Sequence, residues 1–276
     1  MKTFDLLNGC QIMLMRITLH IFLTIVLLTG CSNNDVAIYK EQPVELLYNR
    51  ALAQLQSGTY GPAAAAFLEV ERQHPYSDWA TKAQLMAAFC YYQSNKYDDA
   101  ILSLERFIQI HPTDINVPYA YYLKAISYYE QISDVGRDQQ MTRLALKSLK
   151  EIIVRFPNSK YARDAILKID LAHDHLAGKE MEIGRYYEKK GYYLAAINRY
   201  KQVITQFQTT THVPEALHRL TESYLAIGLK EQANKMASVL GHNFPGSDWY
   251  VDSFKIVKGK TFLEDKKKKY WYWPFD

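Results

Sequence analysis

The stretch GRYYEKKGYYLAAINRYKQVITQF, residues 184–207, contains the pattern that decides the fold of this chain. A small residue, Gly184, is followed three positions later by Tyr187, and a second small residue, Ala196, follows Gly184 by twelve. Lys190-Gly191 between them is a turn signal. Two antiparallel helices approach closely only where the facing side chains are small, and a ring can fill the space beside them. The stretch therefore predicts a helical hairpin.

The same pattern recurs along the chain. Each repeat ends at an aromatic residue or a histidine, usually followed by proline, which cannot continue a helix. These landmarks are His74-Pro75, His111-Pro112, Phe156-Pro157, Phe207-Gln208 and Phe244-Pro245. Two of the intervals between them are 37 residues, and the other two are 45 and 51. A period in the middle thirties with two inserts predicts tetratricopeptide-type hairpins.

Small residues recur at two places in these repeats, which favours close packing of the two helices. On the first helix they are Ala51, Ala88, Ala125 and Gly184. On the second helix they are Ala63, Ala100, Ala196 and Ala233, with Ala145 displaced by an insert. An aromatic residue often follows the first set by three, at Tyr91, Tyr128, Tyr187 and Tyr224. We expect these residues to form the core between paired helices.

The predicted fold is all-α: a superhelical array of about five tetratricopeptide-like helical hairpins with a concave face, after a cleaved signal peptide. Repeats one to three occupy residues 43–157, and an insert enlarges the turn of the third at 133–138. A linking helix and repeats four and five occupy 158–250. The linking helix begins after Asn158 or Ser159 as its N-cap. Gly178 is the weak point before the next helix, and one unusually long helix is the alternative.

The N-terminus carries an apolar run, 17–28, that follows Arg16 and ends at Leu28-Thr29-Gly30-Cys31. The run has about a dozen residues, whereas a membrane-spanning helix needs about 20. A basic residue, a short apolar run and small residues before a cleavage site are typical of a signal peptide, here residues 1–30. The motif resembles a bacterial lipobox, which implies palmitoyl and diacylglycerol groups on Cys31 and a lipidated linker over 31–42. Asp5 is unusual in a signal, so Met13 or Met15 are alternative starts to Met1.

Charge and cysteine content limit the possible functions. Beyond the signal, basic and acidic residues nearly balance except from Lys255 to Asp276, which has seven lysines and three acidic residues. We therefore expect no nucleic-acid partner for the repeats. Cys31 would carry lipid, so no cysteine metal site or disulfide framework is expected. Cys90 lies in an apolar helical run and is predicted to be a small buried hydrophobe.

The C-terminal segment, 251–276, is predicted to be a basic and aromatic tail. Lys266 to Lys269 precede five aromatic residues, Tyr270, Trp271, Tyr272, Trp273 and Phe275. A solvated tail is the usual interpretation of such a charge run. Basic plus aromatic residues also suit a membrane interface or a partner groove. Composition does not separate these two interpretations.

Motifs for catalysis are absent from the sequence. His173-Asp174-His175 resembles a ligand cluster, but residues two apart on a helix point to different faces, so we expect a solvated polar face. No H-E-x-x-H motif, nucleophile elbow or Gly-rich phosphate loop occurs. We therefore predict no enzyme, no cofactor and no metal.

A lipobox followed by five such repeats resembles the family of outer-membrane assembly lipoproteins called BamD, ComL or YfiO. The most specific strings are Glu105-Arg106-Phe107-Ile108, Phe156-Pro157-Asn158-Ser159-Lys160-Tyr161-Ala162-Arg163-Asp164-Ala165 and the residues from Tyr186 to Arg199. The resemblance implies a non-catalytic subunit of the machinery that inserts β-barrel proteins into the outer membrane. It also implies lipid anchoring at the periplasmic face, because Ser32 after the cysteine resembles the pattern sorted to the outer membrane.

The resemblance implies two binding surfaces. The later repeats would dock the periplasmic domains of the BamA-like barrel subunit through Arg199, with Asn198 and Arg185 as weaker candidates. The earlier repeats would receive the C-terminal strand of unfolded outer-membrane β-barrel substrates around His74, Tyr76, Arg106 and Gln109. The family often has a basic residue at the position of Gln109. Glutamine is uncharged, so this chain lacks the charge contact that a basic residue would make there. Other lipoproteins of the machinery are further implied partners.

Two other functions are weighed against this one. The chain could be another tetratricopeptide-repeat envelope lipoprotein that scaffolds cell-wall or division factors. It could also be an envelope hydrolase, but no stretch provides an acid or nucleophile pair. Co-purification of a large barrel protein would distinguish the assembly-machinery role from the role in scaffolding cell-wall or division factors.

Overall fold

The computed structural model describes residues 41–258 of the chain. The predicted signal peptide, Cys31 and the basic and aromatic residues 266–276 lie outside the described residues. The chain divides into two compact units, residues 1–42 and 43–276, and all the helices described belong to the second.

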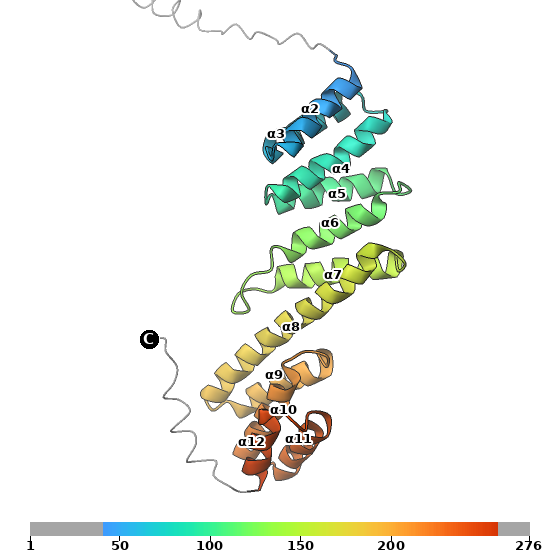
Figure 1. The fold of residues 1–276 in the computed structure, drawn as a ribbon. Helices are drawn as coiled ribbons and strands as arrows, with labels where there is room; N and C mark the ends of the chain where they lie inside the picture. Colours follow the sequence, from blue (N-terminus) through green and yellow to red (C-terminus); the bar gives the residue numbers. More distant parts are fainter. Residues whose placement is uncertain (1–40, 259–276) are drawn as a thin grey trace, which may run out of the picture. The chain divides into compact units, whose positions relative to one another are not determined.

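Eleven α-helices and no strands occur within residues 41–258 (Figure 1). They are α2 (Val44–Gln56), α3 (Tyr60–Gln73), α4 (Asp78–Gln93), α5 (Tyr97–Ile110), α6 (Val117–Tyr129), α7 (Gln140–Arg155), α8 (Lys160–Lys189), α9 (Tyr193–Gln206), α10 (Val213–Ala226), α11 (Lys230–Asn243) and α12 (Asp248–Val257). Each helix packs on the next one along the chain. The first helices of neighbouring hairpins also pack together, as in α2 with α4 and α4 with α6. The predicted array of five helical hairpins is confirmed.

The small residues lie where the sequence predicted, between paired helices. The alanines of both sets have no exposed surface: Ala51, Ala63, Ala88, Ala100, Ala125, Ala145, Ala196 and Ala233. Gly184 shows the constraint most clearly, because a Cβ built on it would lie 2.4 Å from Cε1 of the Tyr200 ring. Tyr200 itself is completely buried. The ring therefore occupies the space that a larger residue at 184 would need.

The turns inside the hairpins use left-handed backbone conformations. Gly58, Gly191 and Gly228 have φ values of 76°, 80° and 81°. Glycine adopts this region without the strain that a Cβ causes, so it suits the residue just after a helix end. The turn signals in the sequence thus correspond to the chain reversals of the first, fourth and fifth hairpins.

The linking segment and the first helix of repeat four form one helix, α8, of 30 residues. Ser159 is its N-cap, and its hydroxyl accepts a hydrogen bond from the amide of Ala162 at 3.1 Å. Ala162 and Ala165 pack in one core cluster with Leu149 and Ile152 of α7. Ala177 and Met181 pack in another with α9 and α10. The single-helix alternative is therefore confirmed, and one element serves two hairpins.

The middle of α8 holds two loops rather than presenting a solvated face. Nε2 of His175 lies 2.7 Å from the carbonyl oxygen of Ser133 in the enlarged turn of repeat three. Asp174 accepts hydrogen bonds from the amide and hydroxyl of Thr211, at 3.0 and 2.7 Å. The expectation of a solvated triplet at 173–175 was wrong, because polar residues at successive helix positions reach loops on different sides.

Helix α12 was not predicted from the sequence. It begins after Ser247, whose hydroxyl accepts a hydrogen bond from the amide of Tyr250, and it packs on α10 and α11. It continues to Val257, beyond the predicted start of the tail at residue 251. Its buried Ser253 contacts Nδ1 of His218 on α10 at 2.8 Å. The array therefore extends one helix beyond the fifth hairpin.

Cys90 is completely buried in α4, as predicted. Burial disfavours the charged thiolate and raises the pKa of Cys90 to about 11. The thiol is protonated at neutral pH and is a core side chain.

The contact between Gly184 and Tyr200 generates a stability prediction. Gly184→Ala should lower the free energy of unfolding by about 1–3 kcal/mol, the usual cost of overpacking a core. The Tyr200 ring cannot move aside easily because its hydroxyl donates to Glu188 at 2.8 Å. Urea denaturation followed by circular dichroism measures the change. The control is Gly61→Ala in α3, where a Cβ meets nothing within 4 Å; it should leave stability equal or slightly higher. Equal stability of the two variants would contradict the packing argument.

Candidate functional site

Arg199 and Asn198 line a small surface hollow on the fourth hairpin. The hollow has a volume of about 220 Å³ and is completed by Tyr187, Ala195 and Gln202. Asn198 is exposed and Arg199 is half-buried. Two of the three residues that the resemblance implied for partner binding, which are consecutive in α9, therefore line one hollow.

Arg199 is held in place by an ion pair within its own hairpin. Its Nη1 lies 3.1 Å from Oε2 of Glu180 on α8, and the two side chains are 39% and 15% exposed. The pairing orients the guanidinium while leaving part of it accessible. A pre-oriented arginine with free donors is suited to a carboxylate or backbone carbonyl of a partner protein.

Arg185 does not line this hollow. Its Nη1 lies 3.1 Å from both carboxylate oxygens of Glu215, which links α8 to α10. Arg185 is thus part of a contact between the fourth and fifth hairpins, although its side chain is still 42% exposed.

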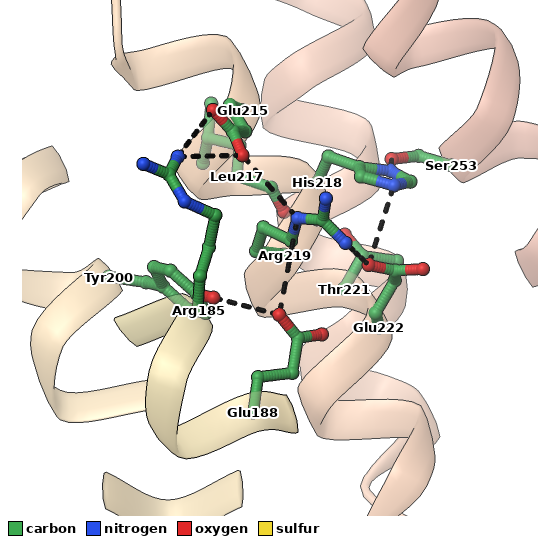
Figure 2. A network of polar contacts seen from close by, with 10 residues as sticks. All are labelled: Arg185, Glu188, Tyr200, Glu215, Leu217, His218, Arg219, Thr221, Glu222 and Ser253. Atoms are coloured by element: carbon green, nitrogen blue, oxygen red, sulfur yellow. Dashed lines mark hydrogen bonds and ion pairs between the residues drawn. The ribbon is translucent and has the colours of Figure 1, made fainter. Parts of the chain in front are cut away.

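Arg185 and Glu215 belong to a larger network of polar side chains, which was not predicted from the sequence (Figure 2). Arg219 of α10 is at its centre. Its Nη1 lies 2.8 Å from Glu222, and its Nε lies 3.5 Å from Glu215 and 4.0 Å from Glu188. Burial alone would lower the pKa of Arg219, but the carboxylates of Glu222, Glu188 and Glu215 outweigh it and raise the pKa. The guanidinium therefore stays charged and neutralises carboxylates from two helices.

Tyr200 connects this network to α9. Its hydroxyl donates to Glu188, and burial followed by the Glu188 carboxylate raises the pKa of Tyr200. The phenol is therefore always protonated and always a donor. Because Tyr200 follows Arg199 directly in α9, the network fixes the helix that presents Arg199.

The network extends to the end of the array through His218. Its Nε2 lies 3.6 Å from Glu222, and its Nδ1 contacts Ser253 of α12. Four helices, α8, α9, α10 and α12, are thus joined by polar contacts in one region. The only sequence signal was local: Glu215 and Glu222 stand four before and three after Arg219, the spacing of helix ion pairs. Nothing in the sequence pointed to Glu188 or Tyr200 as their neighbours.

The residues predicted for the substrate groove lie around the first two hairpins. Tyr76 follows α3 and is fully exposed, and Gln109 of α5 is exposed. His74 is the C-cap of α3 and is partly buried. Arg106 of α5 forms an ion pair with Glu71 of α3. These four residues therefore lie on or next to α3 and α5. None of them lines the hollow on the fourth hairpin or the one beside Asn95.

Arg106 belongs to a smaller polar cluster between the first and second hairpins. Glu71 also accepts a hydrogen bond from Nε2 of Gln84 at 2.9 Å, and the side-chain oxygen Oε1 of Gln84 lies 3.0 Å from Nε2 of His111. Arg106 thus has a structural contact, while more than half of its side chain is exposed.

Two further properties concern the part of the chain that the structure describes. No helix within residues 41–258 combines the length and apolar character that crossing a bilayer requires. Over the same residues, no group of three or more His, Cys, Asp or Glu side chains is arranged to hold a metal ion.

Comparison with known proteins gives consistent matches over the helical array. A family model described as YfiO, outer membrane lipoprotein, matches residues 40–240. The outer membrane protein assembly factor BamD of Caulobacter vibrioides is 50% identical over 228 residues, which cover 83% of this chain and 75% of the relative. BamD of Rickettsia prowazekii is 46% identical over 231 residues, covering 84% and 92% of the two chains. BamD of Neisseria gonorrhoeae is 32% identical over 252 residues, covering 88% and 94%.

The network around Arg219 generates a second stability prediction. Arg219→Met should lower the free energy of unfolding by about 3–5 kcal/mol, because three carboxylates lose their shared cation. Urea denaturation at neutral pH, followed by circular dichroism, measures the effect.

The control for this variant is Arg72→Met. Arg72 pairs with Glu69 on an exposed surface of α3, and such pairs contribute about 1 kcal/mol or less. If Arg219→Met lowered the free energy of unfolding no more than Arg72→Met does, the network would not stabilise the later hairpins.

Proposed function

The chain belongs to the family of YfiO outer membrane lipoproteins, and from this premise we propose that it is a subunit of the machinery that assembles β-barrel proteins in the outer membrane. The matched residues, 40–240, include nearly all of the five hairpins. The support therefore comes from the whole array and not from one motif. The curated relatives named above are assembly factors, and this chain would have the same role.

The protein acts in this proposal as a scaffold that binds and does not catalyse. In the later hairpins the most strongly shifted pKa values are those of Tyr200 and Arg219, and both groups are engaged in contacts between helices. In the earlier hairpins, burial raises the pKa values of Cys90 and Tyr122, and hydrogen bonds to Arg72 and Gln73 lower the pKa of Glu69. Shifts with these causes fit structural contacts better than proton transfer. A helical array offers a large preformed surface for a peptide or for another folded domain.

The proposed docking surface for the BamA-like barrel subunit is the fourth hairpin around Arg199. Exposed aromatic and aliphatic side chains lie on the same hairpin: Tyr186, Tyr192 and Leu194. Arginine and tyrosine beside a shallow hollow are the residue types that dominate the binding energy of protein interfaces. The partly buried network around Arg219 would keep this surface rigid, so little entropy would be lost on binding.

The proposed substrate surface is formed by the first two hairpins around Tyr76 and Arg106. A fully exposed tyrosine and a half-exposed arginine offer a ring and a cation to an extended peptide. The C-terminal strands of outer-membrane barrels alternate aromatic residues and end in a carboxylate, which these two groups would complement. His74 and Gln109 supply further polar contacts in this proposal.

The proposed location is the periplasmic face of the outer membrane, with lipid on Cys31 as the anchor. The family description supports association with the outer membrane. Anchoring would confine the array near the barrel subunit and raise the effective concentration of both partners. Other lipoproteins of the machinery would bind the same array.

Complementation tests both the proposed assembly role and the proposed docking of the barrel subunit at Arg199. Cells depleted of this protein should lose many outer-membrane barrel proteins at once, and the wild-type gene should restore them. Arg199→Glu should restore few of them and should fail to co-purify the barrel subunit, because its carboxylate would face Glu180. Arg199→Gln avoids that repulsion and should show a smaller defect.

Arg155→Glu is the matched control for charge reversal. Arg155 pairs with Glu151 on the exposed surface of α7, so this variant should behave as wild type. Normal barrel levels after depletion would overturn the assembly role. Normal barrel subunit capture by Arg199→Glu would overturn the docking assignment alone.

Peptide binding tests the substrate surface. A fluorescent peptide with the C-terminal sequence of an outer-membrane barrel should bind Tyr76→Ala several-fold more weakly than wild type, as measured by anisotropy. The thermal midpoint should not change, because the side chain is fully exposed. Tyr192→Ala removes an exposed ring from the fourth hairpin and should leave peptide affinity intact. If Tyr76→Ala and Tyr192→Ala bound the peptide with equal affinity, the peptide would not bind at Tyr76.

A further inference from the structure

Within the described residues, the first half of α8 is a first helix without a second helix of its own. Ala162 and Ala165 pack in one core cluster with α7, the second helix of the preceding hairpin. Helix α9 packs on the other half of α8, in the cluster that contains Ala177 (Figure 1). The interval from Phe156 to Phe207 is 51 residues, whereas the regular interval is 37. The additional residues therefore lengthen α8 and add no second helix to cover its first half.

The landmarks show which face of a first helix the second helix covers. In α4, Leu85 and Ala88 stand 11 and 14 residues after His74, and both pack in one cluster with Leu104 of α5. In α6, the residues 14 and 15 positions after His111 pack in the same way with α7. The residue 14 positions after the landmark has no exposed surface in α4, α6 and α10, where it is Ala88, Ala125 and Thr221. This position marks the face that the second helix of a hairpin covers.

On the first half of α8 the same face is exposed. Leu167, Asp170 and Leu171 stand 11, 14 and 15 residues after Phe156. Leu167 and Leu171 are 65% and 60% exposed, and Asp170 is exposed as well. A face that is buried in the other hairpins is therefore open here.

The helical period places this face on the side of α8 where α9 packs. Because 18 residues make about five turns, residues 18 positions apart lie in line along a helix. Ile166 and Asp170 precede Gly184 and Glu188 by 18 positions. Both of these later residues lie against Tyr200 of α9, whereas Ile166 is 49% exposed. Helix α9 thus covers the second half of this side of α8 and leaves the first half open.

The composition of the open face differs from that of a solvated one. Helix α12 is also followed by no second helix within residues 41–258, and the positions 11 and 14 residues after Phe244 are Lys255 and Lys258. Both lysines are exposed, as is usual where water covers a helix. The first half of α8 has leucine at positions 11 and 15 instead. Two leucines four positions apart form an apolar stripe that fits the apolar side of another helix.

Cations outnumber carboxylates around these leucines. Arg163 stands four residues before Leu167 on the same side of α8 and is exposed. Exposed Lys150 of α7 lies near His173 of α8, because burial lowers the pKa of His173 and the charge of Lys150 lowers it further, while Asp170 opposes both. Among the described residues, Arg163, Lys150 and Asp170 form no ion pair. Two unpaired cations and one unpaired carboxylate favour an occupant with excess negative charge.

The open face of α8 consists of Arg163, Ile166, Leu167, Asp170 and Leu171. We propose that an acidic amphipathic helix of a partner protein packs on this face, in the place where the other hairpins have their second helix. The apolar side of the partner helix covers the two leucines, and its carboxylates reach Arg163 and Lys150. From residue 163 to residue 171 the face is about 12 Å long, which a helix of about three turns covers. The inference goes beyond the proposed assembly role and does not depend on docking at Arg199.

Two helices of this chain provide the probes for a binding test. A peptide with the sequence of α5, residues 97–110, is an acidic amphipathic second helix with three acidic residues and one basic residue. A peptide with the sequence of α7, residues 140–155, is its basic counterpart, with four basic residues and one acidic residue. Each peptide carries a fluorophore and is titrated with the full-length protein in detergent, and anisotropy reports binding. The α5 peptide should bind about tenfold more tightly than the α7 peptide, and the difference should shrink as salt is added.

A double serine variant tests the apolar part of the face. Leu167→Ser combined with Leu171→Ser should weaken binding of the α5 peptide about tenfold or more, because the face loses its apolar side chains. The thermal midpoint of the protein should not change, since both side chains are largely exposed. The matched control is Leu46→Ser combined with Leu229→Ser, which removes leucines that are 57% and 48% exposed elsewhere in the array. This control should bind the α5 peptide as wild type does.

A double charge reversal tests the electrostatic part. Arg163→Glu combined with Lys150→Glu should reverse the preference, so that the α7 peptide binds more tightly than the α5 peptide. The matched control, Lys230→Glu with Lys235→Glu, reverses two exposed lysines of α11 and should keep the wild-type preference. Arg199→Glu should also bind the α5 peptide normally, which separates this face from the proposed docking surface.

Several results would overturn the inference. Absence of α5 peptide binding to the wild-type protein, or equal affinity for the two peptides, would show that the face does not recognise an acidic helix. Unchanged affinity of the double serine variant would show that the peptide binds elsewhere. Dimerisation of the wild-type protein in analytical ultracentrifugation, lost in the double serine variant, would show that a second copy of the chain covers the face.

Discussion

Close approach of paired helices at small side chains is the constraint on which this structure depends. In the fourth hairpin, Gly184 faces the ring of Tyr200, and no Cβ fits between them. The same requirement recurs at the buried alanines of the other hairpins. Because such contacts hold the two helices of each hairpin together, the array presents its surface residues on rigid helices.

The contact at Gly184 also connects packing to the candidate docking surface. Tyr200 reaches Glu188 with its hydroxyl, and Glu188 is one of three carboxylates that surround Arg219. A partly buried charge cluster is weak evidence for stability in itself, but it is geometrically demanding, since each carboxylate needs its cation. The cluster thus fixes α8, α9 and α10 relative to one another, and these helices carry Arg199, Arg185 and Glu215. Packing alone would leave their relative rotation less tightly specified.

Helix α8 shows how a repeat protein can vary its spacing without breaking its core. It replaces a connection and a first helix by one element of 30 residues. Its two ends pack in different core clusters. Its middle holds the enlarged turn of repeat three through His175 and Lys179, which bond to the carbonyl oxygens of Ser133 and Gly136. The insert in repeat three and the long helix therefore form one local arrangement.

The sequence by itself determined the array, its hairpin turns and the buried small residues. It could do so because these features depend on local spacing: small residues at fixed intervals, glycine at left-handed turns and proline after helix ends. The sequence also contains the strings that resemble the YfiO family, and the comparisons confirm that the chain belongs to this family. Only the tertiary structure decided which charged residues meet. Glu188 and Arg219 are 31 positions apart, and no local pattern pairs them. The role of the 173–175 triplet likewise depended on neighbours far away in sequence, because polar side chains acquire their partners only when the helices that carry them pack together. The packing of α12 on α10 and α11 also joins distant residues, although its first turn has a local N-cap in Ser247.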